Sequence, residues 1–191
     1  ELYRKGVLDL PDDVIKIWSD NGYGRMVTRR QGNHNPRIDA MPNPNDKGAQ
    51  GIYYHASFYD LQAANHITTL PNQPAHIVRE LGTVLACGGN AFWIVNSSNV
   101  KPHAYYLDLI ARLWREGAGN AFATDTDCEN HAIDPAAQRI VDEHAHEFAV
   151  TYYGKHDADA VSAAYRDYFD AAVSYGDHWD EHAAEQYVNH C

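Results

Sequence analysis

Polar side chains follow three short apolar segments of this 191-residue chain. The first segment ends at Asp20 and Asn21, the second at His55, and the third at Asn96 and Asn99. Carboxylate and amide groups hold the hydroxyl groups of a ligand by hydrogen bonds, whereas an imidazole can donate, accept or transfer a proton near neutral pH. We therefore predict a polar site in which His55 is the candidate catalytic residue and the other four bind the ligand.

Aromatic side chains crowd the second of these segments, which reads GIYYHASFYD. Tyr54 and Tyr59 flank His55 and could form walls of a pocket, so we add both to the ligand-binding set. Successive side chains of a strand point to opposite faces. One of Tyr53 and Tyr54 should therefore face the site while the other packs beneath a helix.

The elements that would position these residues are strands separated by helices. The segments 13–20, 50–57 and 90–96 read as strands, and the segments 76–89 and 103–117 read as helices. Strands that alternate with helices are typical of parallel βαβ units, so the predicted fold class is α/β. The first and third strands lack polar alternation, which favours burial on both faces. Parallel strands should bring their polar carboxyl ends to one shared pocket.

The chain changes character after residue 119, where only helical patterns remain. Asp134 and Pro135 begin a predicted helix that ends at Gly154, and the segments 157–177 and 180–191 continue the pattern. We place a domain boundary within residues 117–132, which gives domains 1–119 and 120–191. The chain also begins and ends inside helical patterns, and we expect it to be part of a longer protein.

The formal net charge of −11 is concentrated in the second domain. Residues 120–191 contain 3 Lys/Arg and 15 Asp/Glu, which gives −12 there and +1 for the rest. Such an acidic surface repels phosphate backbones and anionic lipid, so we expect no nucleic-acid and no membrane partner. Arg25 and Lys101 follow the first and third strands and complete the ligand-binding set, because a cation there could hold an anionic ligand.

Purely structural roles are an alternative for two of these residues. Asp20 could simply cap a turn, and Lys101 could simply begin the next helix. A metal site is not predicted, because His144 and His146 diverge on a helix and no third ligand accompanies the histidines at 178 and 182.

The three strand-end motifs resemble those of the glycoside hydrolase family 115 α-glucuronidases. Members of that family typically read W-x-D-D-N-Y-G, G-x-Y-Y-H-x-S-Y and W-I-x-N-x-G-D-x-K-P. This chain departs from the pattern at Asn21, Gly22, Phe58 and Asn99, where ionisable or hydrogen-bonding groups are lost. The matching residues are Trp18, Asp20, Tyr23, Gly24, Tyr53, Tyr54, His55, Ser57, Trp93, Asn96, Lys101 and Pro102.

The resemblance implies a fold and a function. The fold would be the C-terminal part of a (β/α)8 TIM-like barrel followed by an α-helical bundle segment. The function would be an inverting α-glucuronidase that removes (4-O-methyl-)glucuronic acid from glucuronoxylan without a cofactor. The principal carboxylates would lie largely in earlier strands, so this stretch alone should be inactive. A secreted or periplasmic location and a homodimer of the full-length protein are further expectations from the resemblance.

Two functional hypotheses remain open from the sequence. One is an α-glucuronidase, and the other is a catalytically silent or carbohydrate-binding relative that keeps the pocket walls. The departures at Asn21, Gly22, Phe58 and Asn99 fit either a changed substrate or a loss of activity.

Overall fold

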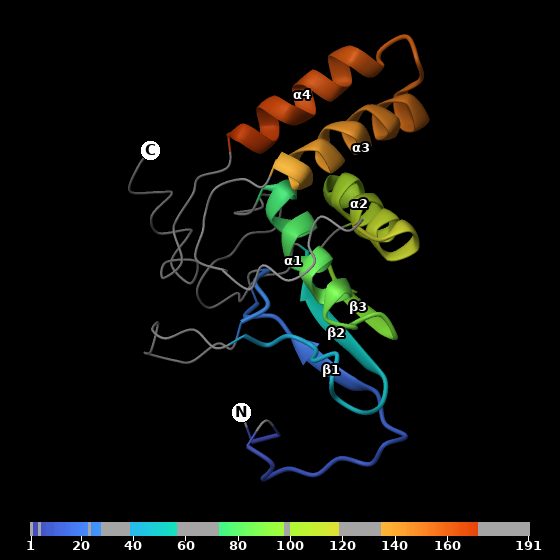
Figure 1. Cartoon of the computed structure of the whole chain (residues 1–191). Helices are drawn as coiled ribbons and strands as arrows, with labels where there is room; N and C mark the ends of the chain where they lie inside the picture. The colour runs from blue at the N-terminus through green and yellow to red at the C-terminus, as the bar shows by residue number, and fades with distance from the viewer. Residues whose placement is uncertain are drawn as a thin grey trace, which may run out of the picture.

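The protein is a mixed α/β structure with one small parallel sheet and four α-helices among its described residues (Figure 1). The computed structural model describes residues 2–3, 5–22, 24–27, 39–56, 73–97, 100–118 and 135–171. The predicted helix at 180–191 and the predicted N-cap at 134 lie outside these ranges. The elements are β1 (Lys16–Ser19), β2 (Gln50–His55), α1 (Pro74–Ala86), β3 (Phe92–Asn96), the 3-10 turn η1 (Lys101–His103), α2 (Ala104–Glu116), α3 (Pro135–Tyr153) and α4 (Ala158–Asp170).

The sheet has the order β1-β2-β3, and both strand pairs are parallel. This confirms the predicted adjacency of successive strands, which right-handed βαβ connections favour. The register pairs Ser19 with Tyr53 and His55 with Asn96. The carboxyl ends of the three strands therefore lie at one edge of the sheet.

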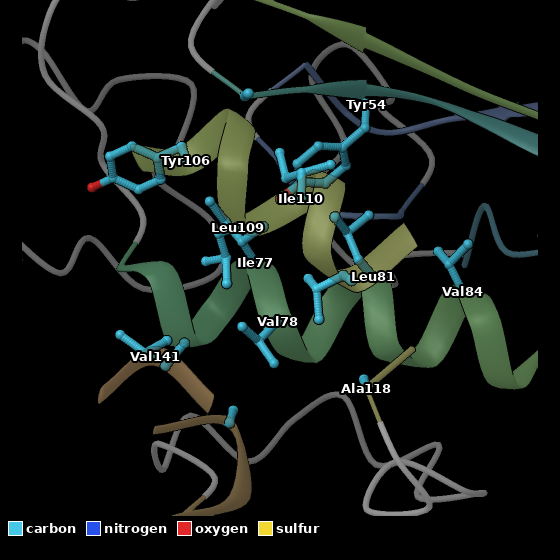
Figure 2. Close-up of a cluster of buried hydrophobic side chains, with 14 of the residues drawn as sticks. Tyr54, Ile77, Val78, Leu81, Val84, Tyr106, Leu109, Ile110, Ala118 and Val141 are labelled. Atoms are coloured by element: carbon cyan, nitrogen blue, oxygen red, sulfur yellow. The ribbon is translucent and has the colours of Figure 1, made fainter. Parts of the chain in front are cut away.

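One face of the sheet is packed against α1 and α2. Figure 2 shows Tyr54 reaching from its strand toward Leu81 of α1 and Ile110 of α2. Ile52 lies on the same face as Tyr54, and both are fully buried. Burial of such large side chains is the main favourable term for holding the helices on the sheet.

The other face of the sheet is apolar and exposed within the described part of the chain. Ile17, Phe92 and Ile94 on this face are 41%, 48% and 42% exposed. The expectation that β1 and β3 are buried on both faces is therefore not met here, because no described element packs on this side. Gly51 pairs with Ile17 on one side and Phe92 on the other, and a Cβ there would come 2.0 Å from the carbonyl oxygen of Phe92.

The helices α3 and α4 extend the same hydrophobic core beyond α1 and α2 (Figure 1). Val78 on α1 points toward Val141 of α3 in Figure 2. Tyr105 of α2 packs against Phe148 of α3 and Phe169 of α4, with ring centroids 5.3 and 4.7 Å away. None of the described helices is both long and apolar enough to span a membrane. The domain boundary near residue 119 stays a prediction.

Candidate functional site

Asp20 connects the polar residues at the carboxyl edge of the sheet through several hydrogen bonds. Its carboxylate is fully buried and accepts backbone N–H groups from Gly22 at 3.1 Å and Gly24 at 2.9 Å. It also accepts the backbone N–H of His55 at 3.1 Å, and its Oδ1 lies 2.6 Å from Nδ1 of the same histidine. Gly22 and Gly24 have φ angles of 88° and 80°, a region that favours glycine, so the turn can wrap around the carboxylate. Asp20 thus joins the end of β1 to the end of β2.

This contact fixes the chemistry of the His55 ring. An ionised carboxylate can only accept a hydrogen bond, so Nδ1 of His55 carries a hydrogen and donates it to Asp20. In the neutral ring the lone pair then lies on Nε2, where it can accept a proton or a hydroxyl hydrogen bond from a ligand. The His55 side chain is 14% exposed, which leaves part of the ring accessible. A buried carboxylate that orients an imidazole is the arrangement that enzymes use for proton transfer.

Tyr53 and Asn96 complete the group on the open face of the sheet. The side-chain amide of Asn96 donates to the hydroxyl of Tyr53 at 2.7 Å. The Tyr53 ring centroid lies 4.8 Å from that of His55. Asp20, His55, Tyr53 and Asn96 therefore form one continuous cluster, which we call the strand-end cluster.

The structure places Tyr54, one of the predicted ligand-binding residues, in the core instead. Its side chain is fully buried, and its hydroxyl donates to the carbonyl oxygen of Gly24 at 2.9 Å. Tyr53 lies beside His55 instead, although the ligand-binding set predicted from the sequence does not include it. The signal was available, because residues two apart share a face of a strand and Tyr53 is two residues before His55.

Asn21 and Arg25 both belong to the loop after β1. The backbone N–H of Asn21 donates to the Arg25 carbonyl at 2.8 Å, and the Arg25 N–H donates to the Asn21 side-chain oxygen at 3.3 Å. Asn21 therefore closes the loop. Burial raises the pKa of the Glu80 carboxyl of α1 above its usual value. The backbone N–H of Met26 and the positive charges of Arg79 and Arg25 act in the opposite direction.

Of the remaining predicted site residues, the structure describes Lys101 alone, which is not part of the strand-end cluster. Lys101 is exposed at the start of η1. Tyr59 and Asn99 lie outside the described residues. Over the ranges that the structure describes, no group of three His, Cys, Asp or Glu side chains is arranged to hold a metal ion.

A separate cavity of about 830 Å³ lies away from the strand-end cluster. It is lined by the segment before β2, by the end of α1 and by residues near the N-terminus, including Asp39, Asp46 and Cys87. None of the four residues of the strand-end cluster lines it. Burial and the nearby Asp39 raise the pKa of the Cys87 thiol, so this cysteine is a poor nucleophile near neutral pH.

Comparisons with known proteins identify the family. The profile described as Glycosyl hydrolase family 115 matches residues 1–176. Among solved structures, the fold is similar to BtGH115A, described as a novel family GH115 4-O-methyl-α-glucuronidase with specificity for decorated arabinogalactans. The match has a TM-score of 0.59 and 19% sequence identity, and it covers 90% of this chain and 19% of that chain. None of the curated proteins matches. The family match over residues 1–176 and the strand-end motifs agree, and the chain belongs to glycosyl hydrolase family 115.

Proposed function

We propose that the chain contributes the strand-end cluster to the active site of a glycoside hydrolase. The observation that carries this proposal is the buried Asp20 carboxylate, which holds Nδ1 of His55 at the carboxyl edge of a parallel sheet. Active sites of parallel α/β enzymes are built at this edge. Membership of glycosyl hydrolase family 115 supports glycosidic-bond hydrolysis as the reaction.

Each residue of the strand-end cluster has a distinct proposed role. His55 presents Nε2 to a sugar hydroxyl or to the reacting oxygen and serves as the catalytic residue of this stretch. Asn96 and Tyr53 hold ligand hydroxyls through their amide and phenol groups. Asp20 orients His55 and does not act as the general acid or base, because its oxygens already face four donor groups. The two carboxyl groups that glycosidases use would come from other parts of the protein.

We also propose that residues 1–119 form the C-terminal part of a (β/α)8 barrel and that residues 120–191 begin a helical domain. The exposed apolar side chains of Ile17, Phe92 and Ile94 on one face of the sheet support this division, because barrel interiors are filled by layers of such side chains. The position of α1 and α2 on the opposite face also supports the proposal, because a barrel carries its helices on the outside of the sheet (Figure 1). A match that covers 19% of BtGH115A supports a longer polypeptide around this stretch.

The proposed substrate is a glycan that carries (4-O-methyl-)glucuronic acid, and glucuronoxylan is the specific candidate, cleaved with inversion. Arg25, at the loop after β1, is the proposed partner for the uronate carboxylate, because an arginine can bind a carboxylate through two hydrogen bonds. BtGH115A is described as specific for decorated arabinogalactans, so both glycans belong in the assay. A homodimer of the full-length protein is part of the same proposal.

The test is replacement of His55 in the full-length protein. His55→Ala should lower release of glucuronic acid by about 100-fold or more, the usual size of a general acid–base contribution. His55→Gln keeps a hydrogen-bonding side chain but cannot transfer a proton, and it should be equally impaired if His55 moves a proton. Wild-type turnover in His55→Ala would contradict the catalytic role.

A catalytically silent, carbohydrate-binding relative is the second candidate function. The saturated hydrogen bonding of Asp20 favours it, because the one described carboxylate at the strand ends is occupied in holding the fold. Such a protein would bind glucuronic acid in calorimetry, and Asn96→Ala would weaken that binding. It would release no sugar from either glycan.

A further inference from the structure

Two side chains of α1 form hydrogen bonds with the backbone of the loop after β1. Glu80 accepts the backbone N–H of Met26 at 2.9 Å, and Nε2 of His76 lies 3.1 Å from the carbonyl oxygen of Gly24. His76 and Glu80 are four residues apart, so they share one face of the helix. They bind backbone groups two residues apart in the same loop.

The two hydrogen bonds of the His76 ring indicate which of its nitrogens carries the hydrogen. The carbonyl of Gly24 can only accept, so Nε2 of His76 is the donor. Arg79 lies with Nη2 3.3 Å from Nδ1 of His76, and a guanidinium can only donate, so Nδ1 is the acceptor. The neutral ring with its proton on Nε2 satisfies both contacts. The hydroxyl of Tyr54 donates to the same Gly24 carbonyl at 2.9 Å.

We call the contacts of His76 and Glu80 with the loop the α1 clamp. The carbonyl and the N–H of Gly24 connect this clamp to the site. Its carbonyl is held by His76 and Tyr54, whereas its N–H donates to the Asp20 carboxylate at 2.9 Å. Asp20 in turn holds both the backbone N–H and the ring of His55. A shift of Gly24 would therefore displace the carboxylate that orients the His55 ring.

We propose that His76 and Glu80 of α1 are positioning residues of the site, which fix the loop 20–27 and through Asp20 the orientation of His55. This inference rests on the proposed function for its effect on turnover. The contacts themselves are independent of the reaction. Geometry held in this way matters because a displacement of about 1 Å in an active site can cost about 100-fold in rate.

The experiment measures amide hydrogen exchange in the loop 20–27 of the full-length protein. Glu80→Leu and His76→Phe keep the size of the side chain but remove its hydrogen bond, and both should accelerate exchange of the loop amides. Glu80→Gln keeps an acceptor oxygen for Met26 and should restore protection. Val78→Ala is the matched control, because Val78 lies on the same helix but points toward Val141 of α3 (Figure 2). It should leave the loop amides unchanged.

Two further readouts follow the effect to His55. The rate at which diethyl pyrocarbonate modifies His55, read by peptide mass spectrometry, should change in Glu80→Leu and His76→Phe but not in Val78→Ala. On the glycan substrate, kcat should fall about 10- to 100-fold in the first two variants and recover in Glu80→Gln.

Each contrary result is distinct. Wild-type loop exchange in both Glu80→Leu and His76→Phe would overturn the clamp. Faster loop exchange with an unchanged modification rate at His55 would overturn the link to the site. A wild-type protein without hydrolase activity would refute the proposed function, while the exchange and modification results would still decide the positioning role.

Discussion

Oδ1 of Asp20 lies 2.6 Å from Nδ1 of His55, and the same carboxylate receives three backbone N–H groups. Removing such a carboxylate from water is costly unless its oxygens are matched by donors. Here the glycine turn after β1 and the end of β2 supply these donors. One buried side chain therefore defines both the path of the backbone and the direction of the imidazole.

Asp20→Asn should destabilise the protein as well as impair it. An amide offers one oxygen where the carboxylate offers two, so its NH2 group would meet backbone donors. Hydrogen bonds to charged groups contribute about 1.5–3 kcal/mol each, and we expect a loss of about that size in the free energy of unfolding. Urea denaturation measures it. Asp46→Asn is the control, because Asp46 is partly exposed and lies 3.8 Å from Lys16. Equal losses in the two variants would contradict a special role for Asp20.

Arg25→Ala should separate charge recognition from loop support. If Arg25 binds the uronate carboxylate, glucuronate binding should weaken by about 1.5–3 kcal/mol while xylose binding stays almost unchanged. Isothermal titration of both sugars into the full-length protein gives the comparison. Arg25 also lies near the partly buried Glu80, and its removal should raise the pKa of that carboxyl further. Equal losses for both sugars would assign Arg25 to the support of the loop.

His144 should make the packing of α3 on α2 sensitive to acid. Its Nε2 lies 2.9 Å from Oδ2 of Asp108, and its ring packs edge-on against Tyr105 at 4.7 Å. Among the described residues, Nδ1 is buried and has no hydrogen-bond partner. Burial lowers the pKa of His144 below its ordinary value of 6.5, although the adjacent Asp108 acts in the opposite direction.

The sign of this effect follows from proton linkage. Below pH 6.5 the unfolded chain takes up a proton that the folded His144 resists, so stability falls as the pH drops toward the lowered pKa and is fully present above 6.5. Thermal unfolding at pH 7 and pH 5 should show this loss in the wild type. His144→Gln should reduce the difference between the two pH values. His146→Gln is the control, because its exposed side chain should leave the difference unchanged. An unaltered pH dependence in His144→Gln would refute the prediction.

Much of the architecture could be predicted from local patterns. The alternation of apolar strands with amphipathic helices predicted β1, β2, β3, α1 and α2 in the right order, because hydrophobic periodicity depends on neighbours in the sequence. Pro135 at the start of α3 and Gly154 after its end were also read correctly. Parallel pairing followed from the connections, and so did the meeting of Asp20, His55 and Asn96 at one edge.

Only the tertiary structure decided which face of the sheet each side chain of β2 occupies. The prediction from the sequence placed Tyr54 in the ligand-binding set, which is wrong, because the packing of α1 and α2 on one face buries Tyr54 and leaves Tyr53 beside His55. The roles of His76 and Glu80 had no local signal at all. Both residues lie on a helix that looks ordinary in sequence, and their partners, Gly24 and Met26, are more than fifty residues away along the chain. Contacts of that range depend on how the helix docks on the sheet, and local sequence patterns do not specify docking.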